Sequence, residues 1–530
     1  MGFLSGLSNP RTPSPREGGA ACCFAVATAW LAVGCSTSRE PPGVEAAVPP
    51  TSDVAAPASA EPPPAASIPS ATAAASATTT ASAPAAPAPP PGDRIYAKAR
   101  FVWIQAAPRA SRGWIGYLTL GGSVRLKNGS AAEAKTLGPG CDAWYAIEPT
   151  GYVCLGADTT LDPNDPVYVA LVAHAANVDD PHPFHYGESI GTPRYERVPS
   201  PAAQREREWD LDDHRSKLAE LGVDTTPAGE AFPELPSMSP LVREARGSVA
   251  RGSTVAWSRS YDAAERTWLY TSDHALVPKD RVIPYPRRTF RGVELGGQTV
   301  LPIAFFRKKD RPQYKRDGEA FVPTGESYRR LSHVMLTGRE EKVAGKTYLE
   351  TKDAGVWVDA LDAAVADVRS PVPYRADEAP GGRRTWIDVS ILTGTLVAYE
   401  DATPVFATLI SPGRGGLPVK GYDPISTAST PVGTFRVDGK FRTATMVSST
   451  DSSIVHADVQ FVQNFHGAHA LHGAYWHDAW GELKSGGCVN LSPIDSKWVF
   501  EWTEPKLPPD WHGLRSIDDF GPPTRVLVRP

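Results

Sequence analysis

Cysteine and histidine, which together can supply a nucleophile and a base, lie close together near the C-terminus of this sequence. Five of the twelve histidines fall between His456 and His477, and Cys488 follows them. A thiol becomes a nucleophile when a nearby imidazole takes its proton. His472 lies 16 residues before Cys488, across one hairpin-sized excursion from which the chain folds back easily. We therefore expect Cys488 to be a catalytic nucleophile and His472 to be its base.

Cys488 is preceded by the stretch Ser485-Gly486-Gly487. Two glycines suit a tight turn, because glycine adopts backbone conformations that other residues avoid. Such a turn brings backbone N–H groups against a substrate, which is what an oxyanion hole requires. We expect Ser485, Gly486 and Gly487 to form this turn and to stabilise an oxyanion.

The residues around this turn resemble a known family. From Ala470 to Trp502 the sequence reads ALHGAYWHDAWGELKSGGCVNLSPIDSKWVFEW. It is similar to the L,D-transpeptidase catalytic domain, also called the YkuD domain, whose signature is His-Gly, about a dozen residues, then Ser/Thr-His-Gly-Cys-x-Arg/Asn. The matching positions are His472, Gly473, Ser485, Gly487, Cys488 and Asn490. The resemblance covers residues 384–530 and includes the upstream stretch TPVGTF.

The resemblance implies a cysteine acyltransferase of the cell wall. In the family, the thiol forms an acyl-thioester on the third residue of a peptidoglycan stem tetrapeptide, with loss of the terminal D-alanine. The side-chain amine of a second stem then accepts the acyl group, which gives a 3→3 cross-link. We expect no cofactor, and we expect substrate contacts from Gly473, Tyr475, Trp476 and Asn490.

One position departs from the family pattern. Gly486 stands where the family has a histidine two residues before the cysteine. An imidazole that tunes the thiolate is therefore missing, and His477 or His469 is a candidate to replace it. Two alternative functions remain open: an L,D-carboxypeptidase that uses water as the acceptor, and a peptidoglycan-binding structural lipoprotein with a weakened site.

A metal site is a further alternative. Ligands sufficient for a zinc-dependent hydrolase are present in His466, His469, His472, His477 and Cys488. Residues three apart in a strand point to opposite faces, and Gly467 and Gly473 disfavour a helix. We therefore expect no metal, and we expect His456 and His466 to be solvated or hydrogen-bonded surface residues.

Strands that alternate apolar and polar residues predict the scaffold of this site. Trp386–Ser390, Thr395–Tyr399 and Val405–Ile410 are typical of a β-meander. Between Arg94 and Leu155, shorter alternating runs are broken by Gly and Pro, as in a small barrel. The order GWIGYLTLGGSVRL followed by WYAIEPTGYVCLG resembles a bacterial SH3-like domain. Such a module either recognises wall peptide or packs to position the next domain.

We predict a mainly β protein with few helices. An L,D-transpeptidase-type β-sandwich or barrel over 384–530 follows small SH3-like β-barrel modules and a disordered Pro/Ala linker. We place a signal peptide at 1–34 and the tether at 35–92. The SH3-like module covers 93–178, and a connecting segment with a helix at 201–222 covers 179–232. One or two further β modules cover 233–372.

The N-terminus predicts export. Arg11 and Arg16 precede an apolar run from Ala20 to Gly34 that ends at Cys35, which is the order of a secretory signal. The run resembles a bacterial lipobox, in which Cys35 takes a diacylglycerol; ordinary cleavage and an uncleaved anchor are the alternatives. Residues 36–92 hold 18 Ala and 14 Pro and no aromatic residue, as expected of a semi-rigid disordered tether. We expect a periplasmic lipoprotein anchored in the outer membrane.

The six cysteines sort once export is accepted. Cys22 and Cys23 leave with the signal peptide, and Cys35 carries the lipid. Cys141 and Cys154 flank a short aromatic hairpin and are expected to pair in an oxidising compartment. Cys488 remains as the reactive thiol, with a buried inert cysteine as the alternative.

The charge balance disfavours other classes of protein. A net charge of −5 gives no basic excess for binding nucleic acid. No stretch reaches the roughly 18 to 20 apolar residues of a spanning helix, which excludes a multi-pass membrane protein. We expect a monomer whose partners are stem peptides and, through Cys35, a membrane.

Overall fold

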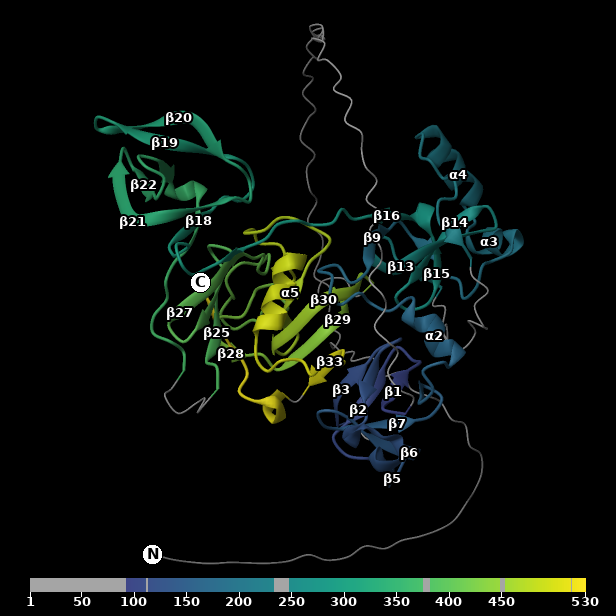
Figure 1. The fold of residues 1–530 in the computed structure, drawn as a ribbon. Coiled ribbons are helices and arrows are strands. Elements are labelled where there is room, and N and C mark those ends of the chain that lie inside the picture. The colour runs from purple at the N-terminus through teal and green to yellow at the C-terminus, as the bar shows by residue number, and fades with distance from the viewer. Residues whose placement is uncertain (1–91, 111–112, 233–246, 375–381, 449–452, 516) are drawn as a thin grey trace, which may run out of the picture. The chain divides into compact units, whose positions relative to one another are not determined.

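A computed structural model describes residues 92–110, 113–232, 247–374, 382–448, 453–515 and 517–530 (Figure 1). The predicted signal peptide, the lipidation of Cys35 and the Pro/Ala tether lie outside these residues. The described chain is mainly β, as predicted, and belongs to one compact unit that begins at Ala85. Within these ranges, none of the helices is long and apolar enough to cross a bilayer.

The predicted β-meander forms the centre of a six-stranded sheet. Its three strands are antiparallel neighbours: β25 (Thr385–Ser390), β26 (Thr395–Glu400) and β27 (Thr403–Leu409). A late strand, β34 (Arg525–Arg529), lies beside β25 in parallel. β17 (Val293–Glu294) and β28 (Gly433–Arg436) complete the order β17-β27-β26-β25-β34-β28.

A second sheet of ten strands carries the predicted nucleophile and base, in the order β32-β31-β30-β29-β33-β3-β2-β7-β6-β5. The C-terminal region provides β29 (Gly439–Val447), β30 (Val455–His466), β31 (His469–Gly473), β32 (Val489–Leu491) and β33 (Gly513–Arg515). The first module provides β2 (Val102–Gln105), β3 (Trp114–Leu118), β5 (Lys135–Gly138), β6 (Cys141–Ala146) and β7 (Tyr152–Leu155).

The two halves of this sheet join where Gly116 pairs with Leu514 and Tyr117 pairs with Gly513. An edge strand left unpaired would expose its backbone N–H and C=O groups, and β33 satisfies those of β3. Within the predicted SH3-like module at 93–178, strands β2, β3, β5, β6 and β7 thus extend the sheet of the C-terminal region.

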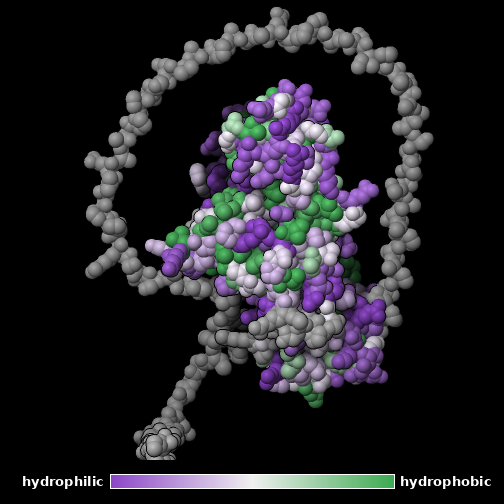
Figure 2. Space-filling model, turned by 90° about the vertical axis from the view of Figure 1, so that its left-hand side faces the viewer, coloured by the Kyte–Doolittle hydropathy of each residue, from purple (hydrophilic) through white to green (hydrophobic). Residues whose placement is uncertain are grey.

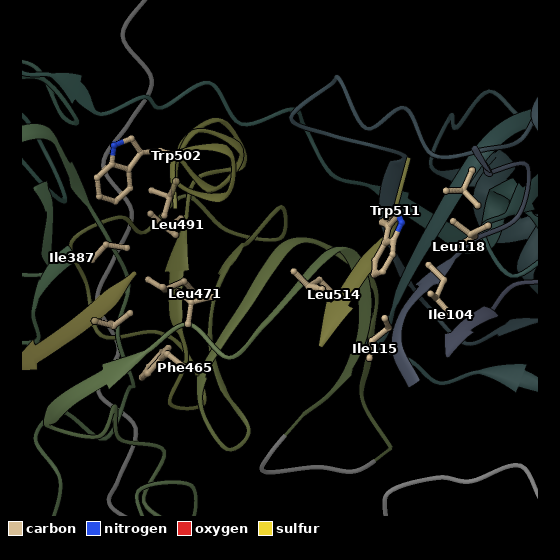
Figure 3. Packing of buried hydrophobic residues seen from close by; sticks show 14 of the residues in the cluster. Ile104, Ile115, Leu118, Ile387, Phe465, Leu471, Leu491, Trp502, Trp511 and Leu514 are labelled. Atoms are coloured by element: carbon tan, nitrogen blue, oxygen red, sulfur yellow. The ribbon is translucent and has the colours of Figure 1, made fainter. Parts of the chain in front are cut away.

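The helix α5 (Pro493–Trp502) packs between the two sheets of the C-terminal region. It begins at Ser492, whose side chain accepts the Asp495 N–H, with Pro493 at the first position. Its Trp498 stacks on Phe406 of β27 at 4.1 Å between ring centroids. Figure 3 shows core residues of the C-terminal region and of the first module that belong to one buried cluster, among them Ile387, Leu471, Trp502, Ile104 and Trp511.

The second module is a six-stranded sheet whose main order is β15-β14-β13-β9-β16. Its strands are β9 (His185–Ser189), β11 (Glu230–Ala231), β13 (Thr254–Ala263), β14 (Arg266–Thr271), β15 (Leu276–Pro278) and β16 (Val282–Pro284). β9 lies in the predicted connecting segment 179–232 and yet sits between β13 and β16. Its residues, HYGES, have no apolar alternation that would predict a strand.

The helix predicted over 201–222 is two helices, α3 (Pro201–Arg207) and α4 (Leu211–Glu220). The helical conformation is interrupted at Glu208, whose buried carboxylate accepts hydrogen bonds from Arg266 and Arg281. Trp209, which lies between the two helices, is 89% exposed. Long-range ion pairing therefore outweighs local helix periodicity here.

The remaining elements form smaller units. Residues 233–372 also hold a seven-stranded sheet, β20-β19-β23-β22-β21-β18-β24, made of β18 (Ile303–Phe305), β19 (Arg311–Asp317), β20 (Ala320–Tyr328), β21 (His333–Val343), β22 (Lys346–Thr351), β23 (Trp357–Asp359) and β24 (Ala364–Ala366). Short strands are β1 (Arg94–Ala97), β4 (Ser123–Arg125), β8 (Thr159–Thr160), β10 (Thr192–Pro193) and β12 (Ser248–Val249). Short helices are α1 (Ala131–Ala134), α2 (Pro166–Val172) and 3₁₀ turns at Lys127–Gly129, Lys279–Arg281, Ala360–Asp362 and Ile517–Phe520. A disulfide joins Cys141 to Cys154 across β6 and β7.

Candidate active site

The parallel pairing of β31 and β32 places the predicted base and nucleophile on one face of the ten-stranded sheet. Leu471 pairs with Val489, and His472 pairs with Asn490. In the same register Cys488 lies beside Ala470, two residues before His472. Residues two apart in a strand share a face, so both side chains project from the same side, offset by about 5 Å across the strands and about 7 Å along them. The opposite face carries Leu471 and Val489 into the core.

His472 is held as a neutral imidazole with one nitrogen left for the proton of the thiol. Its Nδ1 lies 2.9 Å from the carbonyl oxygen of Gly473, which can only accept, so Nδ1 carries the hydrogen and Nε2 is the basic atom. The pKa of His472 is lowered to about 4, chiefly by burial; the bond to the Gly473 carbonyl oxygen opposes this shift, and His456 adds to it. At neutral pH the imidazole is therefore unprotonated and able to act as a base.

Cys488 is a half-buried thiol at the edge of an apolar cluster. It packs against the cluster of Val459, Val462 and Ala470, and its Sγ lies 3.8 Å from the carbonyl oxygen of Ala468. Burial raises the pKa of Cys488 to about 11, although a hydrogen bond from the backbone of Ala470 lowers it. The resting thiol is therefore protonated at neutral pH and needs a base to become a nucleophile.

Ser485 holds the turn before Cys488. The N–H of Gly487 donates to Ser485 Oγ at 3.0 Å, and this hydroxyl donates to the carbonyl oxygen of Cys488. Gly487 has a φ of +131°, and a Cβ there would lie 3.0 Å from His469 Nε2. The predicted turn is present, but the N–H of Gly487 is bonded within it. The oxyanion role expected of Ser485, Gly486 and Gly487 stays a prediction.

Comparison with known families agrees with this geometry. Residues 384–512 match the L,D-transpeptidase catalytic domain family, YkuD. These residues form an L,D-transpeptidase catalytic domain. The domain covers about a quarter of the chain and contains both Cys488 and His472. A comparison with curated proteins finds no match.

Solved L,D-transpeptidases are similar to part of the chain. The one from Xylanimonas cellulosilytica is 24% identical over 30% of this chain and 65% of its own, with a TM-score of 0.20. The one from Stackebrandtia nassauensis is 25% identical over 30% and 62%, with a TM-score of 0.19. The catalytic domain from Enterococcus faecium is 22% identical over 28% of this chain and 99% of its own, with a TM-score of 0.20. The chain thus spans less than two thirds of the first two structures.

His477 and His469 are the two candidates to replace the family histidine. Their rings make the following contacts in this L,D-transpeptidase domain. His477 Nε2 lies 3.1 Å from the amide nitrogen of Asn490, and its Nδ1 accepts the N–H of Ala479 at 3.2 Å. Burial lowers the pKa of His477 to about 3. His469 lies one residue before Ala470, so it faces away from the side of the sheet that carries Cys488. Its ring lies against the backbone of Gly487, where a Cβ would be 3.0 Å from His469 Nε2.

Three of the four residues expected to contact substrate are packed against other parts of the chain. Tyr475 is 1% exposed, stacks on Tyr186 at 3.8 Å, and lies 2.6 Å from both the Thr254 hydroxyl and the Ala457 carbonyl oxygen. A Cβ on Gly473 would lie 2.6 Å from Ser496 Oγ of α5, so this glycine permits close packing of the helix. Asn490 is buried against His477. In this structure Tyr475, Gly473 and Asn490 pack against other parts of the chain, and their contacts with substrate stay a prediction.

Trp476, the fourth expected contact, does border the site. Its ring lies 5.9 Å from that of His472 and stacks on that of His456 at 4.3 Å. His456 was expected at the surface, but its Nδ1 is buried without a hydrogen-bond partner and burial lowers its pKa to about 4. Its position in β30, beside the apolar run that continues to Phe465, was the available signal for an inward-facing ring. His466 is exposed, as expected.

The histidines do not assemble into a metal site. Among the described residues, no group of three or more His, Cys, Asp or Glu side chains is arranged to hold a metal ion. His469 and His472 lie on opposite faces of β31, as their spacing of three requires.

A cavity of about 670 Å³ lies in the second module rather than beside Cys488. Its charged residues are paired with one another, Arg287 with Asp180 and Arg259 with Glu230. The cavity contains no thiol, so the pair of Cys488 and His472 remains the better candidate for covalent chemistry.

Proposed function

We propose that this chain is an acyltransferase that modifies peptidoglycan stem peptides through an acyl-thioester on Cys488. The observation that supports this most directly is the shared sheet face of Cys488 and neutral His472, within an L,D-transpeptidase catalytic domain. No cofactor is required, because a thiol and a base suffice for acyl transfer.

The reaction begins when His472 Nε2 takes the proton of the Cys488 thiol as Sγ attacks the donor carbonyl carbon. The tetrahedral intermediate collapses, the C–N bond to the terminal D-alanine breaks, and the leaving amine takes the proton from His472. An acceptor amine then attacks the thioester and gives a proton to His472. The C–S bond breaks, and the proton returns to Sγ. With the side-chain amine of a second stem as acceptor, the product is a 3→3 cross-link.

The test is mass spectrometry of purified muropeptides before and after incubation with the full-length chain. New dimers with cross-links between third residues are expected from the wild type, and none from Cys488→Ala. Loss of D-alanine without dimers would assign water as the acceptor and make the chain an L,D-carboxypeptidase. Equal product from Cys488→Ala would refute the thioester mechanism.

A wall-binding protein without turnover is a second candidate. Two observations favour it: the raised pKa of the Cys488 thiol and the occupied N–H of Gly487. Labelling of Cys488 by a carbapenem, followed by intact-mass measurement, separates the two candidates, because acylation requires an activated thiol. In either case we propose that Cys35 is lipidated and holds the chain in the periplasm at the outer membrane. The mass of the N-terminal peptide tests this lipidation.

A further inference from the structure

The loop between the base and the nucleophile is held by side chains from outside the L,D-transpeptidase domain. Residues 474–487 form this loop, which connects β31 to Cys488. The side chains that hold it include Arg307 and Arg330. Both lie in the seven-stranded sheet made of β18 to β24, which we call the third module, whereas the family match begins only at residue 384.

Arg330 binds the loop at Asp478. Its guanidinium donates to the carbonyl oxygen of Asp478 at 2.6 Å and lies 3.3 Å from the carboxylate of the same residue. Arg288, in the connection between the second and third modules, lies 3.9 Å from this carboxylate. Asp478 comes two residues after Trp476, whose ring borders the base. The two arginines therefore fix the backbone close to that ring.

Arg307 holds the loop three residues further along the chain. Its Nη1 donates to the carbonyl oxygen of Gly481 at 2.7 Å and to that of Thr393, in the turn between β25 and β26, at 3.2 Å. Hydrogen bonds of this kind compensate a partly buried guanidinium for the loss of water. Gly481 has a φ of +83°, and a Cβ there would lie 3.1 Å from Arg307 Cδ. Glycine at 481 thus permits the close approach of the arginine side chain.

Apolar packing joins the third module to the same loop. Strands β18 and β24 contribute to a buried cluster that also contains Ala474 and Trp480 of the loop. Trp480 is fully buried, and its ring lies 4.7 Å from that of His477. His477 in turn contacts Asn490, which pairs with His472 in the sheet. A continuous set of contacts therefore runs from the third module to the strands of the catalytic pair.

The outer surface of the third module offers little to an apolar partner. The module lies at the top of Figure 2, where hydrophilic residues predominate on the face shown. Among residues 303–366, all of which the structure describes, Leu361 is the one large apolar side chain that is mainly exposed. The other apolar side chains of the module pack within it or against the L,D-transpeptidase domain.

We propose that Arg330 and Arg307 are positioning residues through which the third module orders the loop between base and nucleophile. The ordered loop holds Trp476 beside the base and His477 against Asn490. The order of the loop is independent of turnover, whereas its effect on acyl transfer rests on the proposed function.

The first experiment measures hydrogen–deuterium exchange of the full-length chain by mass spectrometry. Arg330→Ala should speed exchange in a peptide covering 475–484 about tenfold, the effect of losing a hydrogen bond from a charged group, and should leave β26 unchanged. Arg339→Ala is the matched control, because Arg339 pairs with Glu341 inside the third module, and it should exchange as the wild type does. Unchanged exchange in Arg330→Ala would overturn the proposal. Faster exchange throughout the chain would also overturn it, because Arg330 would then stabilise the whole fold.

The second experiment is a double-mutant cycle on muropeptide turnover. Arg330→Ala should lower kcat about tenfold and leave KM within about twofold, because a displaced loop misplaces the groups around the base. Asp478→Ala keeps the backbone carbonyl and should lower kcat less. The double variant should lose no more than Arg330→Ala alone, because both changes remove one ion pair. Arg330→Lys keeps the charge and should recover part of the loss.

Two results of this cycle would overturn the proposal. If the losses in the double variant multiply, the two residues act separately. If KM alone rises, Arg330 serves substrate binding and does not position the base. If the wild type turns over no muropeptide, the proposed function fails, and the exchange experiment still decides whether the third module orders the loop.

Discussion

Two buried polar clusters of this chain are built in opposite ways. In the second module, Glu208 accepts hydrogen bonds from Tyr195, Arg266 and Arg281, and Arg266 also pairs with Asp280. In the L,D-transpeptidase domain, the buried polar atoms without a hydrogen-bond partner among the described residues include His456 Nδ1 and Asn490 Oδ1. We call the first cluster closed, because its charged groups hydrogen-bond to one another. We call the second cluster open, because it contains polar atoms without a hydrogen-bond partner among the described residues.

This difference separates buried polar groups that stabilise the fold from buried polar groups that are available to bind a substrate. A buried polar group without a partner costs stability, so most such groups are satisfied in folded proteins. A closed network stabilises one arrangement of its elements, here the junction of α3, α4 and β14. An open cluster next to a thiol and a base retains unused hydrogen-bonding capacity that a substrate can satisfy. Each of the following predictions tests this distinction.

The largest effect is expected from removing the base in the open cluster. His472→Ala should lower kcat/KM for acyl transfer by roughly 10²- to 10⁴-fold, because it removes the general base of the Cys488 thiol. Muropeptide turnover measures the loss, and circular dichroism should show an unchanged fold. The control is His466→Ala, which alters an exposed histidine at the end of β30 and should keep wild-type turnover. Retention of more than about a tenth of the activity by His472→Ala would show that this ring is not the base.

Opening the closed cluster should reduce stability and leave turnover per folded molecule intact. Glu208→Ala leaves Arg266 and Arg281 buried without their shared carboxylate, and should cost about 3–5 kcal/mol in the free energy of unfolding. Urea unfolding measures it. The exposed pair of Glu230 with Arg259 is the matched control, and Glu230→Ala should cost less than about 1 kcal/mol.

Acid should weaken the same cluster. Burial alone would raise the pKa of Glu208, but Arg266 and Arg281 outweigh it and hold the pKa below its usual value. A lowered pKa in the folded state contributes stability above the unfolded value, and this contribution is lost as the pH falls through the folded pKa. Stability of Glu208→Ala should therefore depend less on pH in the acidic range than that of the wild type. An equal acid dependence would contradict the pairing.

A smaller effect is expected at the thiol. Because the pKa of Cys488 is raised to about 11, its alkylation by iodoacetamide should accelerate about tenfold for each pH unit between pH 7 and 10. Gly486→His restores the family imidazole and should raise the rate at pH 7 about tenfold, equivalent to one unit of pKa. Gly487→His is the contrasting variant, because its φ of +131° strains any side chain and should lower the rate. A wild-type rate already maximal at pH 6 would show that another group activates the thiol.

The smallest effect concerns an unpartnered nitrogen itself. His456→Phe keeps a ring stacked on Trp476 and removes the buried Nδ1, so stability should rise by about 1 kcal/mol. His477→Phe removes nitrogens that are bonded to Asn490 and Ala479, and should lower stability by a similar amount. Thermal unfolding compares the two variants. If both variants are less stable than the wild type, His456 Nδ1 makes a hydrogen bond that stabilises the fold.

Local patterns in the sequence predicted the parts of the fold that depend on local structure. Alternation predicted β25, β26 and β27 to within two residues at each end, and the hairpin around Cys141 and Cys154 carries the expected disulfide. The sequence also predicted that the chain folds back between His472 and Cys488, and the strand register places both on one sheet face. These features rest on contacts between segments that are close in sequence.

Features that depend on distant partners left no local trace. The break at Glu208 requires Arg266 and Arg281, and the burial of Tyr475 requires Tyr186 and Thr254. The sequence around Tyr475 resembles a substrate-binding segment whether or not a second module covers it. The pairing of β3 with β33 could not be predicted either, because the residues of a strand do not specify which distant strand it pairs with.

The position of β33 and β34 in the chain has a consequence for the order of folding. β33 joins β29 to β3, which precedes it by almost 400 residues, and β34 lies between β25 and β28. Both sheets around the nucleophile therefore stay incomplete until residues 513–529 have been synthesised. Unpaired edges are templates for incorrect pairing, and contacts between distant segments form slowly. The two sheets of the L,D-transpeptidase domain consequently reach their full set of strands only when nearly all of the chain is available.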